Sequence, residues 1–481
     1  MPANSWPENH SYRNFPPLRA ILYNLSDPEA GEIDPAIAYS YSGYEGRRAK
    51  AAILLIVAWT GTIALHLVSW GFWLVVGFTG LLCFQALRIL LARPHQTPEP
   101  LAQADQAHWP SVSLLVAAKN EEAVIARLVK MLCHQDYPTE KYEVWVIDDC
   151  SSDRTPEILQ TLSQEYANLK VLRRSANAKG GKSGALNEVL LKAQGDFLGV
   201  FDADAQVPPD MLRRLLPMFN EARVGAVQMQ KVIANAPLNF WTRGQEAEMA
   251  LDLYFQQQRI AVNGIGELRG NGQFVRRSAL ESCGGWNELT ITDDLDLTMR
   301  LHLDGWNIEA IAFPAVLEEG VTSLKALWHQ RNRWGEGGYQ RYLDYWRLIF
   351  TNRIDLLKTW DMFGFWIMQY FLPNAAVPDL LMAIYLKHLP VMSPLTTLAI
   401  SLSLVGMFTG LRRGNPQRET GFLEETRFPT FFGNLVKTLR GTLYMLHWFV
   451  IVASVGMRIS VRPKQLKWVK TVHQGTGELQ F

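Results

Sequence analysis

The sequence is poor in cysteine and in charged residues. Its four cysteines are far apart among 481 residues and form no Cys-x-x-Cys pair, so neither a structural zinc site nor a disulfide framework is expected. We expect buried, reduced thiols instead. Charged residues make up only 19% of the chain, and 47 Lys and Arg nearly balance 46 Asp and Glu. This balance excludes a protein that binds nucleic acid through an overall positive charge.

Apolar residues and tryptophan, by contrast, are abundant. Apolar residues account for 48% of the chain and there are 16 tryptophans. The apolar fraction excludes a disordered chain. Because tryptophan favours the membrane interface, low charge together with many tryptophans indicates that part of the protein contacts lipid. At one domain per ~150 residues, the length predicts about three structural units.

The N-terminal part of the sequence predicts a cytosolic tail followed by a membrane hairpin. Residues 1–46 show no periodicity and lack the basic and apolar segments of a signal peptide. Residues 47–93 contain an apolar run too long for one span, which predicts two spans with a tight turn near Ser69–Gly71. A buried hairpin in a soluble protein fits poorly, because the run has no polar face. Basic residues flank both ends, so both ends are expected in the cytoplasm: Arg47, Arg48, Lys50, Arg88 and Arg93.

A proline-rich linker at 94–110 separates this hairpin from a region of alternating strands and helices, 111–336. Short apolar runs predict buried strands, and amphipathic segments between them predict helices. This alternation is typical of an α/β domain with a mostly parallel sheet, whose ligands bind beyond the carboxyl ends of the strands. The predicted strands cover 112–118, 142–147, 169–172, 197–201 and 224–229.

The C-terminal part predicts a return to the membrane. Residues 337–358 mix aromatic and basic residues, as expected for interfacial helices at the membrane surface. Residues 359–460 form a membrane region, and 461–481 a basic tail. Three full spans would place this tail outside, whereas its charge favours the inside, so we expect that one of the three segments does not cross. The candidate spans are 361–386, which is interrupted by prolines, 391–411 and 441–458.

Two pairs of aspartates end predicted strands. Asp148 and Asp149 follow the strand at 142–147, where they could accept hydrogen bonds from a base or ribose or simply stabilise a turn. Asp202 and Asp204 follow the strand at 197–201. Two carboxylates at this spacing suit a divalent cation that also takes phosphate oxygens.

The segment from Lys179 to Ser183 contains Gly-Lys-Ser and allows a P-loop interpretation. A P-loop needs a glycine where this chain has Ala176. The strand that ends in Asp202 could serve as the magnesium-binding strand of such an NTPase. That alternative leaves two later clusters without a role.

The first of these clusters is Thr292-Asp-Asp294, where Thr292 is a candidate N-cap. The aspartates then either stabilise the helix dipole or supply a general base. The second cluster is formed by Gln330, Arg333 and Trp334, which share one helix face. These side chains could bind a diphosphate and cover an acceptor, or they could mark an interfacial helix.

Taken in order, these motifs resemble those of the membrane-embedded family-2 glycosyltransferases, the group of cellulose and hyaluronan synthases. The resemblance covers about 110–335 and the flanking spans. It departs from the family at Asp293, where glutamate is usual; the charge is kept. The motifs are Val116-Ala-Ala-Lys-Asn-Glu-Glu122, Asp148-Asp149, Lys182 in Gly-Lys-Ser-Gly-Ala-Leu-Asn187, Asp202-x-Asp204, Thr292-Asp-Asp294 and Gln330-Arg-x-Arg-Trp334.

The resemblance implies a GT-A-like nucleotide-sugar-binding domain flanked by transmembrane helices, and a single inverting displacement. It assigns Asp148 and Asp149 to the uracil side and Lys182 to the diphosphate of the donor. Asp202 and Asp204 would hold Mg²⁺ or Mn²⁺, and Asp294 would be the catalytic base. It assigns the acceptor side to Gln330, Arg333 and Trp334.

Within the family, the segments 1–7 and 61–71 are similar to members that transfer glucose from UDP-glucose to diacylglycerol. Four or five spans are also few for a polysaccharide channel, which a lipid acceptor in the bilayer does not need. The resemblance thus implies a multi-pass membrane protein with its catalytic domain on the cytoplasmic face, and no obligatory protein partner is indicated. A processive polysaccharide synthase is the first alternative, the P-loop NTPase the second and a non-catalytic membrane scaffold the last.

Overall fold

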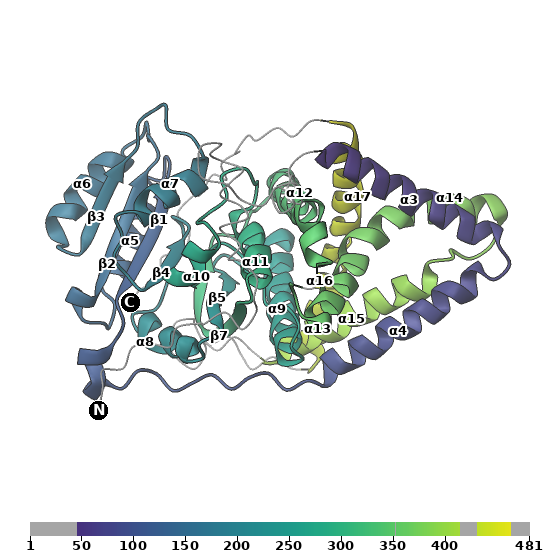
Figure 1. Cartoon of the computed structure of the whole chain (residues 1–481), viewed down its shortest axis with the longest axis horizontal. Coiled ribbons are helices and arrows are strands. Elements are labelled where there is room, and N and C mark those ends of the chain that lie inside the picture. The colour runs from purple at the N-terminus through teal and green to yellow at the C-terminus, as the bar shows by residue number, and fades with distance from the viewer. Residues whose placement is uncertain (1–45, 352, 414–430, 463–481) are drawn as a thin grey trace.

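The computed structural model describes residues 46–351, 353–413 and 431–462. The predicted N-terminal tail and most of the predicted basic tail lie outside these residues. The described chain forms a sheet-containing part and a bundle of long helices, which occupy opposite ends of the molecule (Figure 1).

A seven-stranded sheet forms the centre of the first part, in the order β3-β2-β1-β4-β6-β5-β7. Strands β1 to β4 pair in parallel, and β7 pairs in parallel with β5. Only β6 runs antiparallel to its neighbours, so the predicted mostly parallel α/β fold is confirmed. The strands are β1 (Val112–Ala118), β2 (Tyr142–Asp148), β3 (Leu169–Arg173), β4 (Phe197–Phe201), β5 (Val224–Ile233), β6 (Gln273–Arg276) and β7 (Asn307–Glu318).

Helices cover both faces of this sheet, because buried strands alternate their side chains between two apolar layers. In β1, Leu114 and Val116 face the layer that contains α5, whereas Leu115 faces the layer that contains α7. The helices of this part are α5 (Ile125–Cys133), α6 (Thr155–Glu165), α7 (Gly181–Leu190), α8 (Met211–Leu215), α9 (Phe240–Ala261), α10 (Arg277–Ser282), α11 (Asp293–Leu303) and α12 (Leu324–Ile349), with short 3₁₀ segments at Gln103–His108, Thr139–Lys141 and Leu216–Asn220.

Among the described residues, five helical stretches are long and apolar enough to cross a membrane. The first two, α3 and α4, form the predicted hairpin, with its turn at 68–70. The last stretch begins at Phe431, ten residues before the predicted span, because α16 precedes α17 with only Leu446 between them. The helices are α3 (Arg47–Leu67), α4 (Gly71–Leu91), α13 (Leu356–Trp366), the π-helical turn η5 (Ile367–Phe371), α14 (Leu372–Leu386), α15 (Ser393–Arg413), α16 (Phe431–Met445) and α17 (His447–Val461).

The predicted interruption near the prolines of the third stretch takes the form of the π-helical turn η5, which ends just before Pro373. Proline cannot donate a helical hydrogen bond, and a π-helical turn accommodates the lost bond without ending the helix. Pro378 lies inside α14, which continues through it. The stretch therefore stays helical from Leu356 to Leu386.

Helix α12 joins the two parts of the molecule (Figure 1). It is continuous across 336/337, where the sequence suggests a boundary between the catalytic domain and separate interfacial helices. Its second half is largely buried: Tyr339 and Tyr345 lie in apolar clusters, while Trp346 is exposed. One end of α3 is attached to it, because Arg47 Nε donates to Asp344 Oδ1 at 2.6 Å. The aromatic residues of this segment thus mainly pack inside the protein.

All four cysteines are free. Cys133 and Cys283 are buried, as expected, but Cys83 is exposed and Cys150 is partly exposed. The expectation of buried thiols is therefore wrong for Cys83, because it lies outside the buried face of α4, which is formed by Val75, Thr79, Leu82 and Ala86.

Candidate active site

The sequence-predicted carboxylates gather at the carboxyl edge of the sheet. Asp202 follows β4, and Lys182 in the first turn of α7 contacts it, with 2.6 Å between Nζ and Oδ1. Asp293 and Asp294 begin α11 and act on the same lysine. Burial alone would lower the pKa of Lys182, but these carboxylates raise it above its usual value. The lysine therefore stays protonated among the acids.

Arg333 completes this group from α12. Burial lowers the pKa of its guanidinium, and Asp202, Asp294 and Asp293 oppose that effect. We call these five residues the reaction cluster: Lys182, Asp202, Asp293, Asp294 and Arg333. They come from four separate segments of the sequence, so folding brings together four of the predicted motifs.

Asp294 has the properties of a general base. Burial, followed by repulsion from Asp293, raises the pKa of Asp294 from 3.8 to about 6. The backbone N–H of Leu295 donates to Asp294 Oδ1 at 2.8 Å, and Lys182 and Lys231 favour the ionised form. A carboxylate with a pKa near the operating pH can both accept and release a proton.

Close packing fixes the start of α11. Thr292 holds the predicted N-cap position, although its side chain makes no capping hydrogen bond. Helix α12 lies against Thr292 at Gly337, where any Cβ would overlap the threonine side chain. Gly270 has a φ of +83°, and a Cβ there would lie 3.3 Å from Asp294 Oδ2. Two glycines therefore allow backbone segments to enclose the aspartates.

Asp202 and Asp204 both follow β4 but differ in their surroundings. The Asp202 side chain is 43% exposed, whereas Asp204 is buried and accepts a hydrogen bond from the Glu319 backbone at 2.9 Å. The backbone N–H of Asp202 donates to Asn271 Oδ1 at 3.2 Å. The described residues contain no group of three or more His, Cys, Asp or Glu side chains arranged to hold a metal ion.

This donor set fits Mg²⁺ or Mn²⁺ only together with a substrate. Magnesium commonly uses one or two carboxylates plus substrate phosphates, and Asp202 already pairs with one cationic group, the Lys182 ammonium. Asp202 and Asp204, which both follow β4, are the residues that could hold such an ion.

Asp148 and Asp149 lie at the end of β2. Asp148 is buried and accepts from the Ser151 backbone at 2.9 Å, which is ordinary turn chemistry. Asp149 accepts from Arg174 Nη1 at 2.7 Å, and Arg174 also donates to the backbone oxygens of Lys179 and Gly181. Arg174 therefore connects this aspartate to the start of α7, where Lys182 lies.

The third predicted group, on α12, is arranged around a residue that the sequence reasoning did not single out. Arg331 lies 3.9 Å from the ring centroid of Trp334, and its Nη1 donates to Gln330 Oε1 at 2.9 Å. Lys231 Nζ lies 5.2 Å from the same ring and 2.9 Å from Glu318 Oε2. Two cationic groups, those of Arg331 and Lys231, thus lie against the Trp334 ring.

Sequence reasoning also missed Asn271 and Lys231. Asn271 lies between Gly270 and Gly272, and this Gly-Asn-Gly segment is a recognisable turn signal. Nothing in the local sequence marks Lys231, which belongs to the site only because β5 ends beside β7 and α12.

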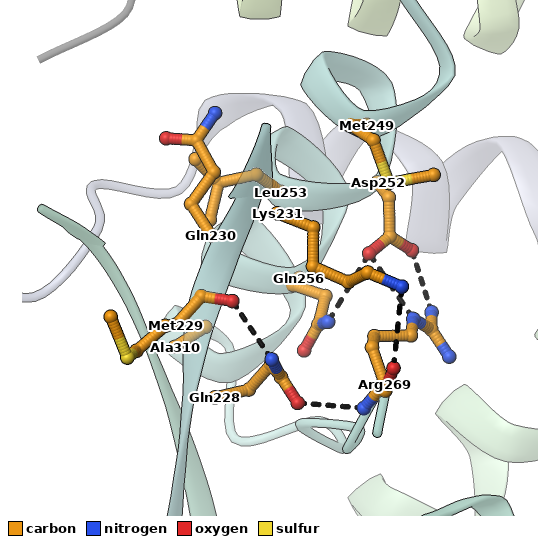
Figure 2. A pocket seen from close by; sticks show the side chains of 10 residues that line it. All are labelled: Gln228, Met229, Gln230, Lys231, Met249, Asp252, Leu253, Gln256, Arg269 and Ala310. Atoms are coloured by element: carbon orange, nitrogen blue, oxygen red, sulfur yellow. Dashed lines mark hydrogen bonds and ion pairs between the residues drawn. The ribbon is translucent and has the colours of Figure 1, made fainter. Parts of the chain in front are cut away.

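A pocket adjoins the site between β5 and α9 (Figure 2). Lys231 points towards Arg269, and Arg269 pairs with Asp252 at 2.6 Å (Figure 2). Met249, Leu253 and Gln256 of α9 form its far wall. Because α9 also packs against α4, α15 and α16, this pocket lies on the side of the catalytic domain that faces the long helices.

Behind this pocket lies a second charged group, which we call the arginine cluster: Glu267, Arg259, Arg269 and Arg341. Glu267 is fully buried and lies 2.7 Å from Arg341 and 2.8 Å from Arg269. Although burial alone would raise the pKa of Glu267, the arginines hold it well below its usual value. Arg259 also pairs with Asp361 of α13 at 2.9 Å.

The fold is that of the GT-A-like glycosyltransferases. A mannosyltransferase from Pyrobaculum calidifontis, solved in complex with GDP-Man and Mn²⁺, superimposes with a TM-score of 0.50 at 20% identity. The superposition covers 84% of this chain and 99% of the other.

Sequence comparison then gives the family. Residues 113–284 match the model of glycosyl transferase family 2, and residues 199–411 that of glycosyl transferase family group 2. Relatives named beta-monoglucosyldiacylglycerol synthase are 58% identical in Nostoc sp., over 99% of this chain and 100% of theirs, and 54% identical in Synechocystis sp., over 99% and 98%. The chain belongs to the family-2 glycosyltransferases. The Gly-Lys-Ser segment is therefore part of a glycosyltransferase domain rather than of a P-loop NTPase.

Proposed function

We propose that the protein transfers glucose from UDP-glucose to diacylglycerol, with inversion, and so makes a β-monoglucosyl lipid. The main support for this reaction is the reaction cluster, in which Asp294, a carboxylate of raised pKa, lies beside the cations Lys182 and Arg333. The names and full-length similarity of the cyanobacterial relatives support the donor sugar and the lipid acceptor.

In this proposal the donor lies across the strand ends. Asp148 and Asp149 lie on the uracil side, and Lys182 approaches the diphosphate, where its charge stabilises the leaving UDP. Asp202 and Asp204 would hold a divalent ion, which neutralises charge on the diphosphate when bound. Lys182 would exchange its contact with Asp202 for one with phosphate, which its flexible side chain permits.

Asp294 acts on the acceptor. It removes the proton from the free hydroxyl of diacylglycerol as that oxygen attacks the anomeric carbon. The new bond forms between this oxygen and the anomeric carbon, and the bond from that carbon to the phosphate oxygen breaks. UDP leaves with the electron pair, and the proton stays on Asp294. Gln330, Arg333 and Trp334 shape the acceptor side.

The attachment of the hairpin supports a catalytic domain on the cytoplasmic face. Arg47, at the basic start of α3, bonds to Asp344 of α12. At the other end, Gln258 of α9 donates to the backbone oxygen of Ile89 at 2.8 Å. Both basic ends of the hairpin thus lie against the catalytic side, where the positive-inside rule places the cytoplasm.

The test uses purified protein in mixed micelles with labelled UDP-glucose and Mg²⁺, with and without diacylglycerol. We expect label in the chloroform phase only when diacylglycerol is present, and more label with Mg²⁺ than with chelator. Label in a high-mass water-soluble product would instead identify a polysaccharide synthase. Equal use of UDP-galactose would overturn the assignment of the sugar.

A further inference from the structure

Glu248 of α9 is the meeting point of three other helices. It accepts hydrogen bonds from Arg331 Nη2 of α12 at 2.5 Å, from the Tyr444 hydroxyl of α16 at 3.0 Å and from Trp448 Nε1 of α17 at 2.8 Å. Glu248 is only 7% exposed. Two of its three donors belong to the last stretch long enough to span a membrane. One buried carboxylate therefore ties that stretch to the helix that carries Trp334.

The contact continues from Arg331 to the site. Arg331 is 1% exposed, and its guanidinium lies 3.9 Å from the Trp334 ring centroid and 5.8 Å from that of Trp448. A planar guanidinium stacks on an indole in a defined orientation, which a flexible ammonium group does not. Since Glu248 orients Arg331, it also restricts the orientations open to Trp334.

The charge of Arg331 is maintained despite burial. Burial alone would lower the pKa of Arg331, but Glu248 and Tyr444 raise it above its usual value. Removing one partner of such a pair leaves the other charge buried and uncompensated, which is costly. The contact is therefore strong enough to hold a side-chain position.

We propose that Glu248 is a positioning residue that holds Arg331 against Trp334 and so sets the geometry of the acceptor side. This proposal rests on the proposed function, because it takes Trp334 to face the lipid acceptor. The proposed contacts to UDP-glucose, by contrast, come from β2, β4 and α7. None of the hydrogen bonds of Glu248 reaches these elements. Loss of Glu248 should therefore impair acceptor use and leave donor binding intact.

The experiment measures KM separately for diacylglycerol and for UDP-glucose, together with the fraction of donor lost to water. For Glu248→Gln, which keeps an acceptor oxygen but loses the charge, we expect KM for diacylglycerol to rise about tenfold. We expect KM for UDP-glucose to stay within about twofold, and the hydrolysed fraction to rise. Tyr444→Phe and Trp448→Phe each remove one hydrogen bond to Glu248. We expect each to raise KM for diacylglycerol and the hydrolysed fraction, but less than Glu248→Gln does.

Trp59→Phe is the matched control. Trp59 also donates its indole N–H within a membrane-spanning stretch, to the Asn374 backbone oxygen at 3.1 Å, but this contact does not involve Glu248. We expect Trp59→Phe to have the wild-type KM for diacylglycerol and for UDP-glucose. Arg331→Lys keeps the charge without the planar face and should resemble Glu248→Gln.

Several outcomes overturn the proposal. One is a Glu248→Gln enzyme with unchanged KM for diacylglycerol. Another is an equal rise in KM for diacylglycerol and for UDP-glucose together with a lower unfolding temperature, which indicates a purely structural role. If Glu248→Gln does not fold, Tyr444→Phe and Trp448→Phe decide, and wild-type kinetics in both overturn it. If the wild-type protein makes no diacylglycerol-dependent product, the proposed function fails, and this is visible before any variant is compared.

Discussion

The reaction cluster and the arginine cluster lie side by side but hold their carboxylates in opposite ways. In the first, burial and Asp293 raise the pKa of Asp294 to about 6. In the second, three arginines hold the pKa of Glu267 well below its usual value. The two clusters also interact electrostatically, because the charge of Asp294 contributes to raising the pKa of Arg269. Burial and repulsion from a neighbouring carboxylate bring the pKa of Asp294 closer to neutral pH, so that it can exchange a proton. The arginines around Glu267 instead keep that carboxylate charged.

In the proposed function, this difference separates Asp294, which reacts, from Glu267, which supports the fold. Asp294 lies beside the partly exposed Asp202 and Lys182, where a ligand can reach it. Glu267 has no exposed side-chain surface and joins α9, α12 and the segment that leads to Asn271. Substitutions in the two clusters should therefore fail in different measurements.

The largest effect on turnover should come from Asp294→Asn. Removal of a general base costs about 10²–10⁴ in rate, and an amide cannot accept the proton. We expect kcat to fall by this factor while UDP still raises the unfolding temperature as in the wild type. Glu157→Gln, on the exposed face of α6, is the control. Retained turnover in Asp294→Asn would remove this residue from the role of base.

Glu267→Gln should instead reduce stability. Neutralising it leaves Arg341 buried beside an uncharged group, which costs about 3–5 kcal/mol in the free energy of unfolding. We expect a lower unfolding temperature in detergent and little folded protein at the temperature at which Asp294→Asn is intact. Glu281→Gln, half-exposed on α10, should unfold as the wild type does. A stable Glu267→Gln protein would contradict the supporting role.

Asp204→Asn should have a smaller, ligand-dependent effect. We expect the metal-dependent part of UDP binding to weaken by at least about tenfold, as measured by calorimetry with Mg²⁺ and with chelator. UDP binding without metal should stay close to that of the wild type. Equal weakening under both conditions would show that Asp204 supports the fold rather than an ion.

The smallest effect is a shift in pH dependence. Because Asp294 must be ionised to accept a proton, kcat should fall below about pH 6, as this carboxyl takes up a proton. Asp293→Asn removes the neighbouring negative charge, so the pKa of Asp294 should decrease and the acid limb should move to lower pH. An acid limb at the same pH in both proteins would exclude repulsion by Asp293 as a cause.

The sequence predicts β1 and β4 well because both are short, buried and almost entirely apolar runs. Strands β1 and β4 have the predicted bounds. Strand β6 is missed because it has only four residues and includes Gln273 and Arg276. Strand β7 is missed because it contains Pro314, at a shift in its register with β5.

The same distinction applies to the site. Strand ends place Asp202 and Asp204 at one edge of the sheet, and the topology of a parallel sheet makes this predictable. The role of Glu267 depends on arginines that lie 8 residues before it, 2 after it and 74 after it. No local pattern encodes such a group, so only the folded structure reveals it.

From the continuity of α12 we expect the candidate active site to be sensitive to the thickness of the bilayer. One continuous helix carries Arg333 and Trp334 and packs against both α3 and α17. Helices that are longer or shorter than the bilayer core respond by tilting. Because α17 packs against α12, a tilt of α17 should rotate α12 and move Trp334 relative to the sheet. Thin and thick membranes should therefore support different rates of the same enzyme.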